Sequence, residues 1–216
     1  IDFQGVLNAS VAGKTWYLGG FANTGNINVS AGTVRMDTYS GTGSWTNTST
    51  VGKGIAVSGT GVLNLGDAFN ASTLGNIAQS GSGAVNLIGT MTLDQASTNL
   101  STAGLTALTI DGGTVAGGGN TLTSNGTLAL SATGYGTLNN VTLATDLAVT
   151  GVTYLTNGLT LAANATTSNP ATVTINNATL HYTGTQTLGG TGNVVFSGAS
   201  NSWFYRNGGA ATLTVG

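Results

Sequence analysis

A five-residue motif recurs along most of this chain of 216 residues. It consists of a glycine, any residue, an apolar residue, any residue and a second apolar residue. It stands at residues 61–65, 83–87, 126–130 and 192–196. Alternating apolar residues are typical of a short strand with one buried face, and the glycine favours a turn before that strand. A strand that restarts at near-constant intervals predicts a stacked β-structure.

The spacing of the strands indicates which stacked structure to expect. Gly61 and Gly83 are about 22 positions apart, and the strands at 171–175, 192–196 and 211–215 follow at intervals of about 19 to 21. Because further short strands lie between these copies, each repeat holds two or three strands, as in a single-stranded parallel β-helix. Coils that stack about 4.8 Å apart would number roughly ten and give a rod on the order of 50 Å long.

The same pattern predicts which side chains are buried. In the copy at residues 61–65, the alternate residues Val62, Leu63 or Leu65 would stack on their equivalents in the next coil and form a narrow continuous core. Thr, Ser and Asn would then face outward and form hydrogen bonds up and down the stack. We therefore expect residues 1–216 to form one all-β solenoid domain.

Composition supports strands and argues against helices. Charged residues make up only 5 % of the chain, which holds 36 Gly, one Pro and no Glu. Amphipathic helices fill their solvent face with Glu, Lys and Arg, whereas Thr, Val and Ile fit a pleated strand. A hydrophobic content of 40 % with a net charge of -2 excludes ordinary disorder. The sequence contains no run of 18 apolar residues, so it predicts no transmembrane helix. The main rival for the fold is a tandem of antiparallel β-sandwiches.

Residues 1–50 depart from the regular pattern. Their strands are less even, so we expect less regular coils or a cap-like region there. Aromatic residues are denser in this region, and the simplest interpretation is that wider coils need larger core residues; a sugar-binding or partner-binding surface is the alternative. These aromatic residues are Phe3, Trp16, Tyr17, Phe21, Tyr39 and Trp45.

A second departure gives the candidate binding residues. Residues 202–207 contain three consecutive aromatics, which cannot all face one side of a strand, so at least one of Trp203, Phe204 and Tyr205 should point outward. An outward ring beside Arg206 would stack on a sugar or dock a neighbouring domain. Trp203, Tyr205 and Arg206 are therefore the predicted ligand-binding residues, with packing against the next coil as the alternative interpretation.

The sequence offers little for catalysis. The chain has one histidine, His181, and no cysteine, and we expect no metal site and no cofactor. A polysaccharide lyase or glycoside hydrolase would need clustered carboxylates, and Asp67, Asp94 and Asp111 are the acids that neighbouring coils would bring closest. They are three of six widely separated acids, the others being Asp2, Asp37 and Asp146.

Two further classes of function can be weighed from the residues. Pairs of Thr one residue apart, at Thr121 and Thr123, Thr172 and Thr174, and Thr212 and Thr214, would resemble an ice-binding face if they formed one column. Nucleic acid is not an expected partner, because two Lys, two Arg and an isoelectric point near 4.8 leave no basic stripe.

Residues 126–216, with strands such as 136–143, 157–161 and 185–196, resemble the strand-repeat regions of bacterial surface proteins, namely filamentous-haemagglutinin-type adhesins and autotransporter passenger domains. The resemblance implies a right-handed parallel β-helix that is exported to the cell surface and acts as a stalk, adhesin or matrix component. Glycans, surface proteins and further copies bound end to end would be its partners. No membrane insertion by this segment is expected.

The two ends of the sequence led to one more expectation. The chain begins at Ile1 without a basic and apolar leader, and residues 211–216 still have the pattern of a strand and a turn. We therefore expect a segment of a longer chain.

Overall fold

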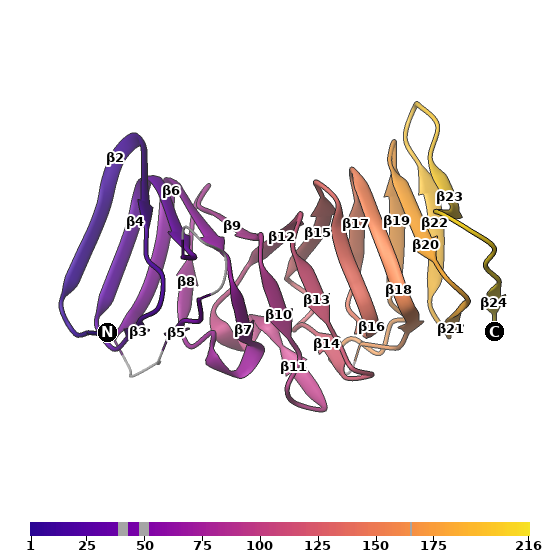
Figure 1. The fold of residues 1–216 in the computed structure, drawn as a ribbon, viewed down its shortest axis with the longest axis horizontal. Helices are drawn as coiled ribbons and strands as arrows, with labels where there is room; N and C mark the ends of the chain where they lie inside the picture. Colours follow the sequence, from indigo (N-terminus) through magenta and orange to yellow (C-terminus); the bar gives the residue numbers. More distant parts are fainter. Residues whose placement is uncertain (39–42, 48–51, 165) are drawn as a thin grey trace.

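Parallel strand pairing organises the chain. The computed structural model describes residues 1–216 except 39–42, 48–51 and 165, and among them every pairing between named strands is parallel. Figure 1 shows the strands lying across the longest axis of the molecule, with the two termini at opposite ends. The all-β prediction is confirmed, and the antiparallel sandwich is excluded for the described residues.

The strands form three sheets. The ten-stranded sheet holds, in spatial order, β2 (Val6–Tyr17), β4 (Asn26–Met36), β6 (Gly54–Leu65), β9 (Ala84–Leu87), β12 (Ala107–Asp111), β15 (Ala129–Thr133), β17 (Leu147–Val149), β19 (Thr172–Asn176) and β22 (Asn193–Ser197), with β8 (Ile77–Gln79) beside β6. The three-stranded sheet holds β1 (Asp2–Phe3), β3 (Ala22–Asn23) and β5 (Thr46–Asn47).

The eleven-stranded sheet follows the same direction along the molecule. Its main path holds β7 (Ala68–Asn70), β10 (Thr90–Thr92), β13 (Thr114–Ala116), β16 (Gly136–Ala144), β18 (Val152–Leu161), β20 (Thr179–Thr183) and β23 (Trp203–Arg206), and beside this path lie β11 (Ser97–Asn99), β14 (Thr121–Thr123), β21 (Gln186–Gly190) and β24 (Leu213–Val215). The two helices are short 3₁₀ turns, η1 (Ala71–Thr73) and η2 (Leu100–Ala103). No helix in the described part of the chain has the length and apolar character needed to cross a membrane.

A column of apolar side chains runs through the ten-stranded sheet from β4 to β22. Its members occupy the same register position on successive strands, and all but the last are 0 % exposed. The last member is 54 % exposed, because β22 is the final strand of this sheet. The members are Met36, Leu65, Leu87, Ile110, Ala132, Val149, Ile175 and Phe196.

Polar side chains on the opposite face of the strands bond along the stack, as the sequence predicted. The Asn86 amide donates to the Asn64 side chain over 2.9 Å, and the Ser131 hydroxyl donates to the Thr109 hydroxyl over 3.1 Å. Inward apolar and outward polar positions therefore alternate on strands such as β9 and β12, which is why the chain needs few charges. In the copy at residues 61–65, Leu63 and Leu65 are the buried pair.

The prediction of constant intervals is only partly right. Val62 pairs with Ala84 and Val173 with Val194, at the predicted spacing, but register partners elsewhere are as close as 17 positions and as distant as 29. The predicted equivalence of residues 211–215 with 192–196 is wrong, because Leu213 of β24 pairs with Gln186 of β21 in the other sheet. The strands β22, β23 and β24 pair in order with β19, β20 and β21, so residues 213–215 are equivalent to residues 186–188.

Residues 1–50 use most of their described aromatic residues as core. Trp45 is 2 % exposed and packs on Phe69 with ring centroids 4.4 Å apart, and three others are partly buried against the core, namely Phe3, Trp16 and Phe21. Tyr17 is 51 % exposed and lies under the Arg35 guanidinium. Tyr39 lies outside the described residues. Register shifts interrupt the pairing of β2 with β4 and of β4 with β6, so these long strands are bulged.

Replacing Leu87 in the buried column by alanine should reduce the free energy of unfolding by about 2 to 5 kcal/mol, because the stack cannot close the resulting cavity. The matched control is Asn86→Ala on the opposite face of β9, which removes one hydrogen bond and should cost about 0.5 to 1.5 kcal/mol. Urea unfolding of the variants measures both. Equal losses would contradict the assigned faces.

Candidate functional site

The predicted binding residues lie on β23 but face in different directions. Trp203 and Tyr205 are 54 % and 47 % exposed, whereas Phe204 between them is partly buried against the core. The expectation of an outward aromatic is therefore confirmed. Arg206 pairs in register with Tyr182, in a column that begins with core residues, so it occupies the opposite face of β23 from Trp203 and Tyr205. That column holds Phe69, Met91, Val115, Leu138, Leu155, Tyr182 and Arg206.

Trp203 and Tyr205 belong to a larger group of rings, which we call the aromatic row: Tyr135, Tyr154, His181, Tyr205 and Trp203. Tyr154, His181 and Tyr205 stand at one register position on β18, β20 and β23. The centroid of the His181 ring lies 5.2 Å from that of Tyr154 and 4.3 Å from that of Tyr205. Tyr135 lies 6.4 Å beyond Tyr154, and Trp203 lies 6.4 Å from Tyr205.

His181 is the buried centre of the aromatic row. It is 8 % exposed, and its Nδ1 has no hydrogen-bond partner. Removal from water lowers the pKa of His181 below its ordinary value, so the ring is neutral at pH 7. A neutral, covered imidazole acts here as a spacer between two tyrosine rings.

Tyr135 reaches the row through an unusual backbone conformation. Its φ is +69°, and Gly134 before it has a φ of +53°. A bulky side chain rarely adopts this left-handed region, and the strain costs about 1 to 2 kcal/mol. The Tyr135 amide nevertheless donates to the Val152 carbonyl over 2.9 Å, and the ring, which is 65 % exposed, lies nearly parallel to that of Tyr154 with an angle of 18° between the planes.

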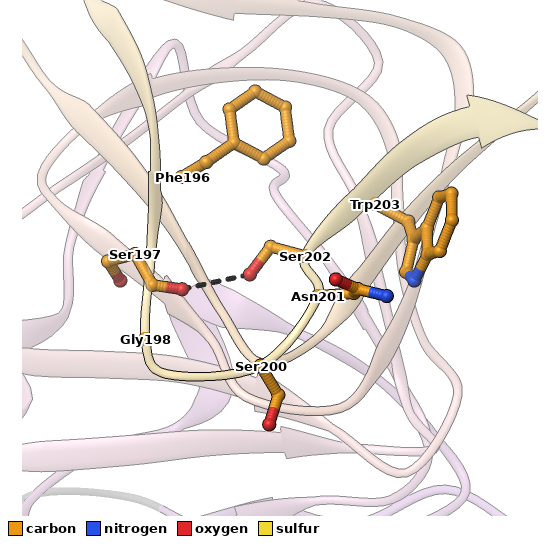
Figure 2. A pocket seen from close by; sticks show the side chains of 7 residues that line it. All are labelled: Phe196, Ser197, Gly198, Ser200, Asn201, Ser202 and Trp203. Carbon is orange, nitrogen blue, oxygen red and sulfur yellow. Dashed lines mark hydrogen bonds between the residues drawn. The ribbon is translucent and has the colours of Figure 1, made fainter.

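A hollow of about 400 Å³ lies beside the row, where the loop between β22 and β23 turns. Figure 2 shows the side chains of Phe196 and Trp203 on two sides of this hollow. The Ser202 hydroxyl donates to the Ser197 carbonyl over 2.9 Å and holds the two ends of the loop together. Trp203 therefore borders both the hollow and the aromatic row.

The acids occupy structural positions. Asp67, Asp94 and Asp146 each accept a hydrogen bond from the backbone N–H of a residue 22 to 29 positions away in the sequence, over 2.7, 3.0 and 2.8 Å. The Asp37 carboxylate pairs with the Arg35 guanidinium at 2.5 Å.

The enzyme hypothesis required Asp67, Asp94 and Asp111 to lie together, and the strands do not gather these three acids. Asp67 directly precedes β7, Asp94 follows β10 at the opposite end of that strand pair, and Asp111 ends β12 in the other sheet. The described residues contain no group of three or more His, Cys, Asp or Glu that could hold a metal ion.

The Thr pairs do not form one column. Thr121 and Thr123 lie on β14 of the eleven-stranded sheet, whereas Thr172 and Thr174 lie on β19 of the ten-stranded sheet. Thr123 is also only 7 % exposed, so this pair does not present both side chains to solvent as an ice-binding face would require.

Comparison with known proteins adds no identification. No protein-family model matches the chain, and neither the curated proteins nor the solved structures contain a significant match to it. The site must therefore be judged from its own geometry.

The sequence did not predict that Tyr135, Tyr154 and His181 join Trp203 and Tyr205. Successive ring positions of the row, from Tyr135 to Tyr154, His181 and Tyr205, are 19, 27 and 24 positions apart. The intervals of 27 and 24 match the strand register, because Val152, Thr179 and Trp203 are also successive partners at 27 and 24 positions. The interval of 19 does not, because the register partner of Tyr154 is Thr137, 17 positions away, and Tyr135 lies two residues before Thr137. The signal becomes visible only once the length of each coil is known.

Stability should fall as the pH is lowered through the ordinary pKa of histidine, about 6.5. Because burial lowers the folded-state pKa of His181, the unfolded chain takes up the proton first, and the stability present above pH 6.5 is progressively lost as the pH falls through the folded-state pKa. His181 is the only histidine, so His181→Phe should abolish this loss in urea unfolding at pH 7.5, 6 and 5. The same pH dependence in both proteins would show that His181 is not responsible.

Proposed function

We propose that this chain is a structural and adhesive segment of an exported bacterial cell-surface or extracellular-matrix protein, wound as a right-handed parallel β-helix of roughly ten coils. The single observation that carries the proposal is the buried column from Met36 to Phe196, which keeps one register position over eight successive strands. A stack of this kind resists bending, because every strand is bonded to the strand before it and the strand after it.

The surface supports the same proposal. The outward positions carry Asn, Thr and Ser that bond along the stack, and the acids bond to the backbone of other coils. Extracellular location and bacterial origin rest on the resemblance of residues 126–216 to surface-protein repeats. The role is mechanical: the rigid segment holds its two ends at a fixed distance and presents its side chains away from the cell.

Removing one whole coil tests the architecture and the rigidity together. Leu108 pairs with Leu130, so deletion of residues 108–129 joins Ala107 directly to Leu130 and places Thr137 over Thr90. The protein should still fold and should be shorter by one strand spacing, about 4.8 Å. Deletion of residues 108–118 is the control, because it removes half a coil and should prevent folding.

The length is measured between two spin labels. The chain has no cysteine, so Ser10→Cys and Asn207→Cys introduce unique exposed sites near opposite ends. Double electron–electron resonance should give one narrow distance distribution, shifted by the deletion of residues 108–129. A broad distribution in the intact chain would refute a rigid stalk, and an unfolded whole-coil deletion would refute the coil assignment.

End-to-end self-association is a variant of the proposal that one residue opposes. Arg206 holds a core-facing register position above Tyr182, and an inward-pointing charge on an edge strand disfavours the addition of another strand. The strands at the two ends of the ten-stranded sheet also differ, with 12 residues in β2 and five in β22. Two copies would therefore match poorly end to end.

Arg206→Leu should promote association of the purified chain, because it replaces the charge by an apolar side chain that continues the column. Sedimentation velocity at increasing concentration should detect larger species in this variant only. Arg206→Lys keeps the charge and should remain like the wild type. Filaments of the wild-type chain, or an unchanged Arg206→Leu variant, would argue against a protective role of Arg206.

A further inference from the structure

The aromatic row has the form of a binding surface that runs along the long axis. It crosses three strand spacings, from the start of β16 to β23, a length of about 14 Å. The planes of Tyr135 and Tyr154, and those of Tyr154 and His181, are within 18° of parallel with centroids 6.4 and 5.2 Å apart. These two pairs are stacked, whereas Tyr205 stands edge-on to His181 at 67° and Trp203 stands edge-on to Tyr205 at 82°; both arrangements are common for aromatic pairs.

Stabilisation of the fold does not by itself account for the row. Tyr135 keeps a strained φ although glycine would fit its turn without strain, and its ring is 65 % exposed. His181 is buried with an unpartnered Nδ1, where phenylalanine would pack without an unsatisfied group. Tyr135 and His181 therefore each reduce the stability of the fold and keep a ring of the aromatic row in place.

The side chains beside the row are polar and uncharged. Asn139, Thr156 and Thr183 share one register position on β16, β18 and β20, parallel to Thr137, Tyr154 and His181. They supply hydroxyl and amide groups next to the rings. The nearest acid at the Tyr135 end is Asp111, whose carboxylate lies against Gly134.

These features indicate which class of ligand fits the aromatic row. Flat rings contact the apolar C–H faces of pyranose sugars whose hydroxyls are all equatorial, and the flanking hydroxyls and amides pair with the hydroxyls at the edges of the sugar. Arg206 occupies the opposite face of β23 from Trp203 and Tyr205 by its register position, and Asp111 repels an anionic sugar at the other end.

We propose that the aromatic row binds a neutral polysaccharide with equatorial β-linkages, whose chain lies along the long axis with successive sugar rings over Tyr135, Tyr154 and the pair Tyr205 and Trp203. The hollow beside Trp203 lies at the end of this path. This inference gives the adhesive part of the proposed function its ligand class and rests on it; the rod itself does not depend on the ligand.

Isothermal titration calorimetry with soluble hexasaccharides tests the proposal on the whole chain. Cellohexaose or chitohexaose should bind, whereas maltohexaose, which has axial linkages, and an oligogalacturonate, which is anionic, should bind at least about tenfold more weakly. Failure of both β-linked hexasaccharides to bind at millimolar concentration would overturn the proposal. So would equal or tighter binding of the axial or the anionic probe.

Variants assign the binding to the row. Trp203→Ala and Tyr205→Ala should each weaken binding roughly fivefold to tenfold, the value of one aromatic contact. Tyr135→Gly removes a ring while relieving backbone strain, so it should weaken binding although the protein is at least as stable in urea. This combination separates a ligand contact from a packing role.

Tyr17→Ala is the matched control, because Tyr17 is 51 % exposed on β2, outside the row. It should bind like the wild type, and equal weakening by Tyr17→Ala and Trp203→Ala would contradict the assignment. The spin-label distance between positions 10 and 207 separates the two proposals. A narrow distance distribution without sugar binding would support the rigid stalk and refute the polysaccharide proposal. A broad distribution would refute the rigid stalk, whether or not a sugar binds.

Discussion

Register between parallel strands is the constraint on which the rest of the structure depends. Each strand presents alternate residues to its two faces, so a slip of one residue would exchange the buried column for the polar ladder. Leu87 would then face solvent, and Asn86 would enter the core. The eight aligned residues from Met36 to Phe196, most of them fully buried, make such a slip costly at every coil. The core is therefore also the element that fixes the position of every outward side chain.

Buried amide side chains maintain this register where the backbone leaves the ladder. The Asn164 amide donates to the carbonyls of Ser124 and Ala144 over 3.0 and 2.9 Å, and its oxygen accepts from the amides of Thr166 and Thr167. The Gln186 amide likewise bonds to the carbonyls of Leu155 and Thr183, and its oxygen accepts from the Gly158 amide. These side chains supply the bonds that a missing strand would have supplied, so coils of unequal length can stack without unpaired backbone groups.

Local pattern was enough to predict the strands, the inward leucines and the absence of long helices. It was not enough to predict the site, for a physical reason. Alternation is a property of five consecutive residues, whereas the row depends on which residue of one coil lies over which residue of the next. That register depends on turn lengths, which range from tight turns to the loop at residues 162–171. The wrong placement of residues 211–215 has the same cause, because β24 lies over β21 and not over β22.

One register position shows how the surface of the stack changes along its length. Along the eleven-stranded sheet, this outward position carries Thr90, Thr114 and Thr137 and then changes to Tyr154, His181 and Tyr205. The strands keep the same parallel pairing across this change, so the surface changes while the core column beside it continues. A substitution at an exposed outward position such as Tyr205 changes stability little, whereas His181 at the same register position is buried among the rings. Tyr135 shows a limit on such changes: to add a ring to the row, the chain accepts a strained turn, and the strain remains because the paired strands on either side hold the turn in place.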